Sequence, residues 1–135
     1  MQDSDNNVEE LSREKFAQLH RDLKLLEDSL PIWKESLNDR SSLTEIRRGL
    51  RRIKIMARSL SLGVAVEVAD AAENLLNRVV EGTIAISSQI FLVIQEVEIL
   101  LLEVVEAAEQ EQVFPNNKVD LLIERADLLA SGMHL

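Results

Sequence analysis

Six basic residues gather in the segment 47–58 of a chain whose formal net charge is −9. On a helical wheel four of them form one narrow line, here called the basic stripe: Arg47, Arg51, Lys54 and Arg58. Two more flank this line: Arg48 and Arg52. The apolar residues of the segment fall on the opposite side, so we expect the stripe to face water. Like charges one helical turn apart repel each other by about 0.2–0.5 kcal/mol, so stability alone does not favour this arrangement.

The basic stripe has two interpretations. A line of exposed cations can steer and orient an acidic protein partner, which makes it a docking face. Alternatively, carboxylates of a neighbouring helix neutralise it, or it is simply solvated. The sequence alone leaves both open.

Other residue types that perform chemistry are scarce. The chain has no cysteine and only two histidines, His20 and His134, and it contains neither a Gly-rich phosphate loop nor a Glu-x-x-His pair. We expect His20 to lie at the edge of an apolar helix face and Met56 to pack. We expect the paired acidic residues to lie on a solvent-exposed helix face: Glu96 with Glu98 and Glu103 with Glu106. The sequence therefore predicts no catalytic residue, no metal site and no cofactor.

Length and composition point to one all-α domain. The chain has 135 residues, of which 46% are hydrophobic, with only four Gly and two Pro. We expect no signal peptide, and the most apolar segment, 88–105, carries charges that argue against a membrane span. We expect a cytoplasmic location and no membrane insertion. The net negative charge argues against nucleic acid as a partner.

Apolar periodicity predicts an up-down-up-down four-helix bundle with an accessory C-terminal helix. The expected parts are a disordered segment 1–7, the bundle at 8–112, and a C-terminal helix and tail at 113–135. In the first helix, Val8 and four leucines should face inward, with Trp33 at the edge, and Pro31 should kink or interrupt the helix. Ser42 and Glu45 form a capping-box pattern for the second helix. Further helices are expected at 64–81, 87–109 and 117–130.

The helix expected at 87–109 is more apolar than one bundle position requires. Four residues fall outside its main apolar face: Phe91, Leu92, Ile99 and Leu102. Either the helix at 117–130 covers them, or they allow a homodimer.

Three sequence blocks resemble a known family. These are "LTEIRRGLRRIK" (43–54), "AENLLNRVVEGTI" (72–84) and "IERADLLASG" (123–132). They resemble the histidine phosphotransfer (HPt) domains that occur in tandem at the N-terminus of CheA-like hybrid kinases of type IV pilus chemosensory systems. The first two blocks match the family spacing without a gap. The resemblance covers nearly the whole chain and implies a four-helix phosphorelay domain whose partners are receiver domains.

The acceptor position departs from the family. Arg51 stands where the family has its phosphoryl-accepting histidine, and Arg52 replaces the Ser or Thr that follows. Lys54 matches the family lysine that assists the phosphoryl group. Because a guanidinium stays protonated at any ordinary pH, Arg51 is no nucleophile. The resemblance therefore implies that phosphoryl transfer is lost.

The next turn departs from the family as well. Ile55 and Met56 replace the pair of small residues that lets a receiver domain approach closely, while Arg58 matches the pilus-type version. Beside the stripe, Ile55 and Met56 could supply an apolar contact to a partner.

Three hypotheses follow. The first is a phosphorylation-incompetent, non-enzymatic HPt-like interaction or scaffold module that binds receiver (response regulator) domains or other chemosensory components. If the chain is a fragment, its parent can still be a histidine kinase. The second is a structural spacer or dimerisation bundle in such a kinase, and the third is an active phosphotransfer domain that uses His20.

Overall fold

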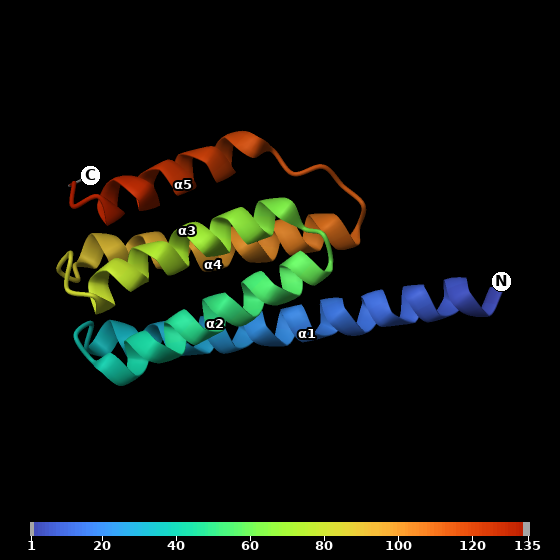
Figure 1. Cartoon of the computed structure of the whole chain (residues 1–135), viewed down its shortest axis with the longest axis horizontal. Helices are drawn as coiled ribbons and strands as arrows, with labels where there is room; N and C mark the ends of the chain where they lie inside the picture. Colours follow the sequence, from blue (N-terminus) through green and yellow to red (C-terminus); the bar gives the residue numbers. More distant parts are fainter. Residues whose placement is uncertain (1, 134–135) are drawn as a thin grey trace.

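The computed structural model describes the backbone of residues 2–133 and the side chains of residues 8–133. All regular structure in this range is helical: α1 (Gln2–Glu35), α2 (Arg40–Ser59), α3 (Gly63–Val80), α4 (Ser88–Glu109) and α5 (Asn116–Ala130). Consecutive helices run antiparallel (Figure 1). The first four form the expected up-down-up-down bundle, and α5 lies along its side. The sequence prediction of an all-α, up-down-up-down bundle with an accessory C-terminal helix is confirmed for the described residues.

The helices differ in how many neighbours they have. α2 packs on α1 and α3, whereas α4 packs on α1, α3 and α5. One continuous core runs between them, and its largest fully buried side chains include Trp33, Leu50 and Leu101. Met56 packs against this core from its rim, as expected. α2 therefore keeps one whole side free of protein cover.

α2 begins two residues earlier than predicted, and the predicted capping box is wrong. Asp39 is the N-cap: its Oδ1 accepts a hydrogen bond from the Ser41 backbone N–H at 3.2 Å. Ser42 Oγ donates to Asp39 Oδ2 at 3.0 Å instead of capping the helix itself. A carboxylate two residues before the free N–H groups satisfies them better than the later hydroxyl.

Pro31 does not interrupt α1, which continues to Glu35. Pro31 is exposed, while Leu30 and Trp33 on the other side are 4% and 0% exposed. Burial of these two side chains holds the last turn in place although Pro31 donates no backbone hydrogen bond.

α1 is also longer than its neighbours. With 34 residues it spans about 51 Å, and its N-terminal part extends beyond the bundle (Figure 1). The backbone of residues 2–7 belongs to this helix. Their side chains, Met1 and the tail residues His134 and Leu135 lie outside the described part. Val8, expected in the core, is 64% exposed because it lies on the protruding part.

The surplus apolar residues of α4 divide between core and surface. Phe91 is buried because Trp33 of α1 packs on it with ring centroids 5.3 Å apart, so α1 covers it, whereas the sequence offered the helix at 117–130 or a homodimer. Trp33 is likewise a core residue and not an edge residue. Leu102 is half-buried. Leu92 and Ile99 are each 51% exposed and remain on the surface.

Glu98 is buried, at 7% exposure, and not part of a solvated face. It lies at the contact between α4 and α1, where burial raises the pKa of its carboxyl group above 4.5. The Glu27 carboxylate acts in the same direction, and the Lys24 ammonium opposes it. None of the described helices is long and apolar enough to cross a membrane.

Candidate functional site

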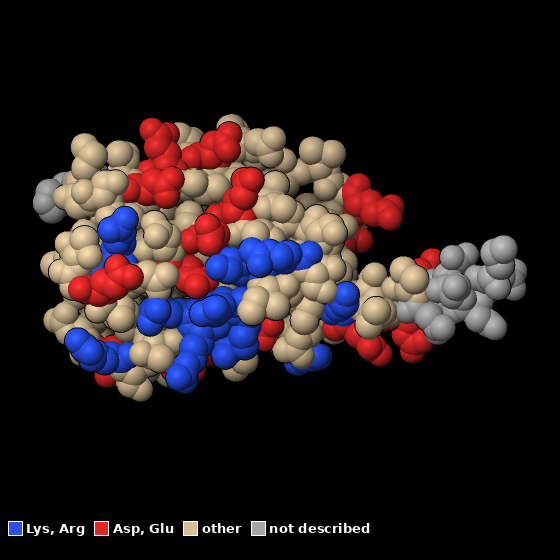
Figure 2. All heavy atoms as spheres, in the orientation of Figure 1, with Lys and Arg blue, Asp and Glu red and all other residues tan. Residues whose placement is uncertain are grey.

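The packing of α2 places the basic stripe at the surface. Its inward residues recur every three or four positions and are all buried: Leu43, Ile46, Leu50, Ile53 and Ala57. The stripe lies on the remaining arc of the helix. Figure 2 shows Lys and Arg gathered along α2, with acidic side chains concentrated above them over α3 and α5. Four arginines are exposed as predicted: Arg48, Arg51, Arg52 and Arg58. Arg47 and Lys54 instead turn towards α3.

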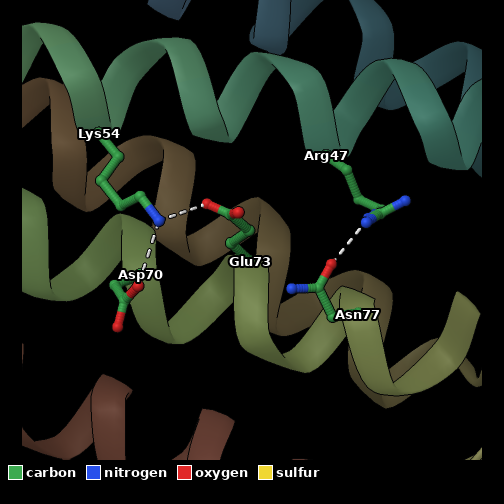
Figure 3. A network of polar contacts seen from close by, with 5 residues as sticks. All are labelled: Arg47, Lys54, Asp70, Glu73 and Asn77. Carbon is green, nitrogen blue, oxygen red and sulfur yellow. Dashed lines mark hydrogen bonds and ion pairs between the residues drawn. The ribbon is translucent and has the colours of Figure 1, made fainter. Parts of the chain in front are cut away.

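Lys54 is held by two carboxylates of α3 (Figure 3). Its Nζ lies 2.8 Å from Glu73 Oε2 and 3.3 Å from Asp70 Oδ1, and the side chain is only 15% exposed. Glu73 Oε2 is a buried atom without a hydrogen bond of regular geometry, so this ammonium is what neutralises it. The contact that the Lys54 ammonium donates to the Glu73 carboxylate raises the pKa of Lys54 above 10.5; Asp70 adds to this, and partial burial opposes it.

Arg47, nearer the N-terminal end of α2 than Lys54, also contacts α3. Its Nε donates to Asn77 Oδ1 at 2.9 Å (Figure 3). The three acceptors on α3, Asp70, Glu73 and Asn77, are spaced at i, i+3 and i+7 and so form one line facing α2. Sequence reasoning named none of them as partners, although this spacing carries the signal.

The other cations of α2 are solvated. Arg48 lies 3.6 Å from Glu45 on its own helix, in an exposed pair. Three residues, here called the exposed arginines, have no ion pair among the residues with described side chains: Arg51, Arg52 and Arg58. The neutralised-stripe interpretation is therefore right for Lys54 but not for these three.

The apolar residues beside the stripe also differ from each other. Ile55 is 56% exposed, which is high for a large aliphatic side chain, whereas Met56 is half-buried against the core. Of the two predicted contact residues, Ile55 therefore has the larger exposed fraction. Surrounded by arginines, it combines an apolar contact with charge, which is typical of protein-binding surfaces.

The chemistry of this surface is binding. The guanidinium groups are permanently charged donors that match carboxylates and phosphates in pairs of parallel hydrogen bonds. Arg51 itself has no basic lone pair to attack a phosphoryl group. No described group of three or more His, Asp or Glu side chains is placed to hold a metal ion.

His20 belongs to a different contact. It lies half-buried on α1, as expected for an edge residue, and its Nε2 contacts Glu109 Oε1 at the end of α4. The structure does not bring it to the stripe on α2.

No protein-family model matches the sequence, and no curated protein sequence matches it. The fold is similar to that of the phosphorylated P1 domain of CheA3 from R. sphaeroides, solved in complex with CheY6. The TM-score is 0.80 at 16% sequence identity, and the match covers 93% of this chain and 98% of that chain. The neighbour is an HPt domain, which confirms the HPt-like fold.

Proposed function

We propose that this domain is a phosphorylation-incompetent HPt-like module that binds receiver domains without accepting a phosphoryl group. The observation that carries the proposal is Arg51, which is exposed in the middle of the stripe on α2 and forms no ion pair with any side chain of residues 8–133. By the sequence resemblance, this is the position of the family's acceptor histidine. A protonated guanidinium there binds anions but forms no covalent phosphoryl adduct.

The structural neighbour supports the choice of partner. Its P1 domain was solved with CheY6 bound, and this chain has the same fold. Exposed arginines on one helix complement an acidic protein surface and speed association with it. Ile55, exposed among them, supplies apolar surface that can be buried on binding.

The wider setting follows from the sequence resemblance. The three matching blocks support a setting in a cytoplasmic, CheA-like signalling protein of a type IV pilus chemosensory system that controls twitching motility. In that setting a non-enzymatic module acts as a scaffold that holds or sequesters a receiver.

A titration tests the docking proposal. The labelled domain is titrated with the receiver domains of its own signalling system, and so is a variant with Arg47, Arg51, Lys54 and Arg58 changed to Ala. We expect salt-sensitive binding that the variant loses while it keeps its helical circular dichroism. Absence of binding to every receiver, with both proteins folded, would overturn the proposal.

A phosphotransfer assay tests the loss of chemistry. Wild type and Arg51→His should both stay unlabelled, whereas Arg51→His combined with Ile55→Gly and Met56→Ser should gain acceptance. The triple variant removes side chains that obstruct a close approach as well as restoring a nucleophile. Acid-labile phosphate on His20 of the wild type would contradict the proposal and support an active phosphotransfer domain.

A second candidate function, a dimerisation bundle, is favoured by one observation. Leu92 and Ile99 lie one heptad apart on α4 and are both half exposed. A concentration-dependent dimer that Leu92→Glu or Ile99→Glu disrupts would support this function. A monomer at every concentration would exclude it.

A further inference from the structure

The face that carries the basic stripe also carries a matching line of acids. The acidic strip consists of Asp120, Glu124 and Asp127 on α5 with Glu67 and Asp70 on α3, and all five residues are exposed. The α5 members are spaced at i, i+4 and i+7, as are Arg47, Arg51 and Lys54 on α2. Figure 2 shows the two sets side by side on one face, with red above blue. The molecule thus presents two parallel lines of opposite charge.

The surface is hollowed along the acidic strip. A hollow of about 480 Å³ lies between α2, α3 and α5, with Asp70, Glu73 and Asp127 in its wall. A second, of about 440 Å³, adjoins it between α3 and α5 and is lined by Glu67, Asp120 and Glu124. Ile123 lines both. Such hollows can admit an arginine side chain, with carboxylates for its head and an aliphatic side chain for its stem.

We propose that a second copy of this chain docks on this face, with the stripe of each copy on the acidic strip of the other. A two-fold axis that runs parallel to α2, between the basic stripe and the acidic strip, sets the stripe of each copy on the strip of the other. The same self-complementary patch then forms the interface on both copies. The axis also sets α2 of one copy antiparallel to α5 of the other, because α2 and α5 run in opposite directions (Figure 1). Arg51 and Arg58, which have no ion pair among the described side chains of their own chain, gain carboxylate partners.

Net charge limits the strength of this dimer. Each copy carries −9, but charges farther apart than the Debye length, about 8 Å at physiological ionic strength, are largely screened. The facing charges lie within that distance and attract. Self-association therefore weakens in concentrated salt. It also occupies the arginines that would dock a receiver, so dimer and receiver complex exclude each other.

Sedimentation equilibrium with charge-reversed variants tests the proposal. The average mass of the wild type should rise above 15.2 kDa as the concentration increases. Arg51→Glu with Arg58→Glu, and separately Glu124→Lys with Asp127→Lys, should each weaken association by about tenfold or more. A mixture of the two variants should associate again, because both lines then meet opposite charge. Glu103→Lys with Glu106→Lys, on α4, is the control for the α5 variant because it changes the net charge by the same amount and in the same direction, and it should associate like the wild type.

Three results would overturn the proposal: a wild type of 15.2 kDa at every concentration, association that survives in both variants, or a mixture that stays monomeric while each variant is folded. Association lost only in Leu92→Glu would assign the dimer to α4 instead. The α5 variant also separates this proposal from receiver docking, since it retains every arginine of α2. It should still bind a receiver if the docking proposal holds, whatever its own oligomeric state.

Discussion

α2 and α4 have similar lengths, 20 and 22 residues, but different surroundings. Three helices cover α4, and even Phe91 and Glu98, off its main apolar face, are buried. Two helices cover α2, which leaves an arc for six basic side chains. The difference teaches where to look for function in such a bundle. A helix with two neighbours instead of three can present charge without loss of core, and on α2 that charge is only partly satisfied by the described side chains.

The largest effect should come from the core beneath the stripe. Leu50→Ala should lower the free energy of unfolding by about 2–5 kcal/mol, because Leu50 is fully buried. Leu92→Ala is the matched change on the exposed side of α4 and should cost much less. Urea denaturation of both variants measures the two values. Equal values would contradict the assigned faces of the two helices.

Next in size is the link between α2 and α3. Lys54→Ala should cost about 1–3 kcal/mol at pH 7 because it leaves the Glu73 carboxylate buried without its cation. Since the folded-state pKa of Lys54 is raised above 10.5, the wild-type advantage is full below that pH and is lost as the pH rises through the raised pKa.

Urea denaturation between pH 7 and pH 12 follows this loss, and Lys54→Ala with Glu73→Ala completes a double-mutant cycle. The double variant should lose less than the sum of the single ones. Strict additivity would mean that the two groups do not interact.

On α4 a smaller effect of opposite sign is expected. The pKa of Glu98 is raised in the folded state, so its contribution lowers stability progressively as the pH rises above about 4.5. Glu98→Gln should therefore increase the free energy of unfolding at pH 7, and this gain should vanish in acid. Thermal unfolding at pH 4 and pH 7 tests it. A variant less stable than the wild type at pH 7 would show that the ionised carboxylate is stabilising.

The smallest stability effect belongs to Arg51. Arg51→Ala should change the free energy of unfolding by less than about 0.5 kcal/mol, because an exposed side chain without partners contributes little. Thermal unfolding of the variant and of the wild type measures this difference in stability. If the variant unfolds, the stripe is structural and the docking proposal is wrong.

The sequence predicted the helices and the inward face of α2 because apolar spacing of three and four residues reports burial directly. It predicted a cover for Phe91 but not that Trp33 of α1 supplies it, because a single helical wheel contains no partner helix. Glu98 was missed for the same reason. The start of α2 was misplaced because two polar residues competed for one cap, and backbone geometry favoured Asp39.

The sequence predicted that the basic residues form one line on α2. It did not predict which of them pair with α3 and which stay exposed. Whether Lys54 is neutralised and Arg51 is not depends on where α3 lies relative to α2. The acceptors at 70, 73 and 77 are spaced to form a line, yet only the packed pair of helices shows which cations they reach.

The most direct test of the central claim compares two double variants in one receiver titration. Arg51→Ala with Arg58→Ala removes two exposed arginines from the stripe, whereas Lys24→Ala with Lys118→Ala removes the same charge from α1 and α5. The account predicts that the first variant loses receiver binding by about tenfold or more and that the second binds like the wild type. Equal binding by both folded variants would show that α2 is not the docking face.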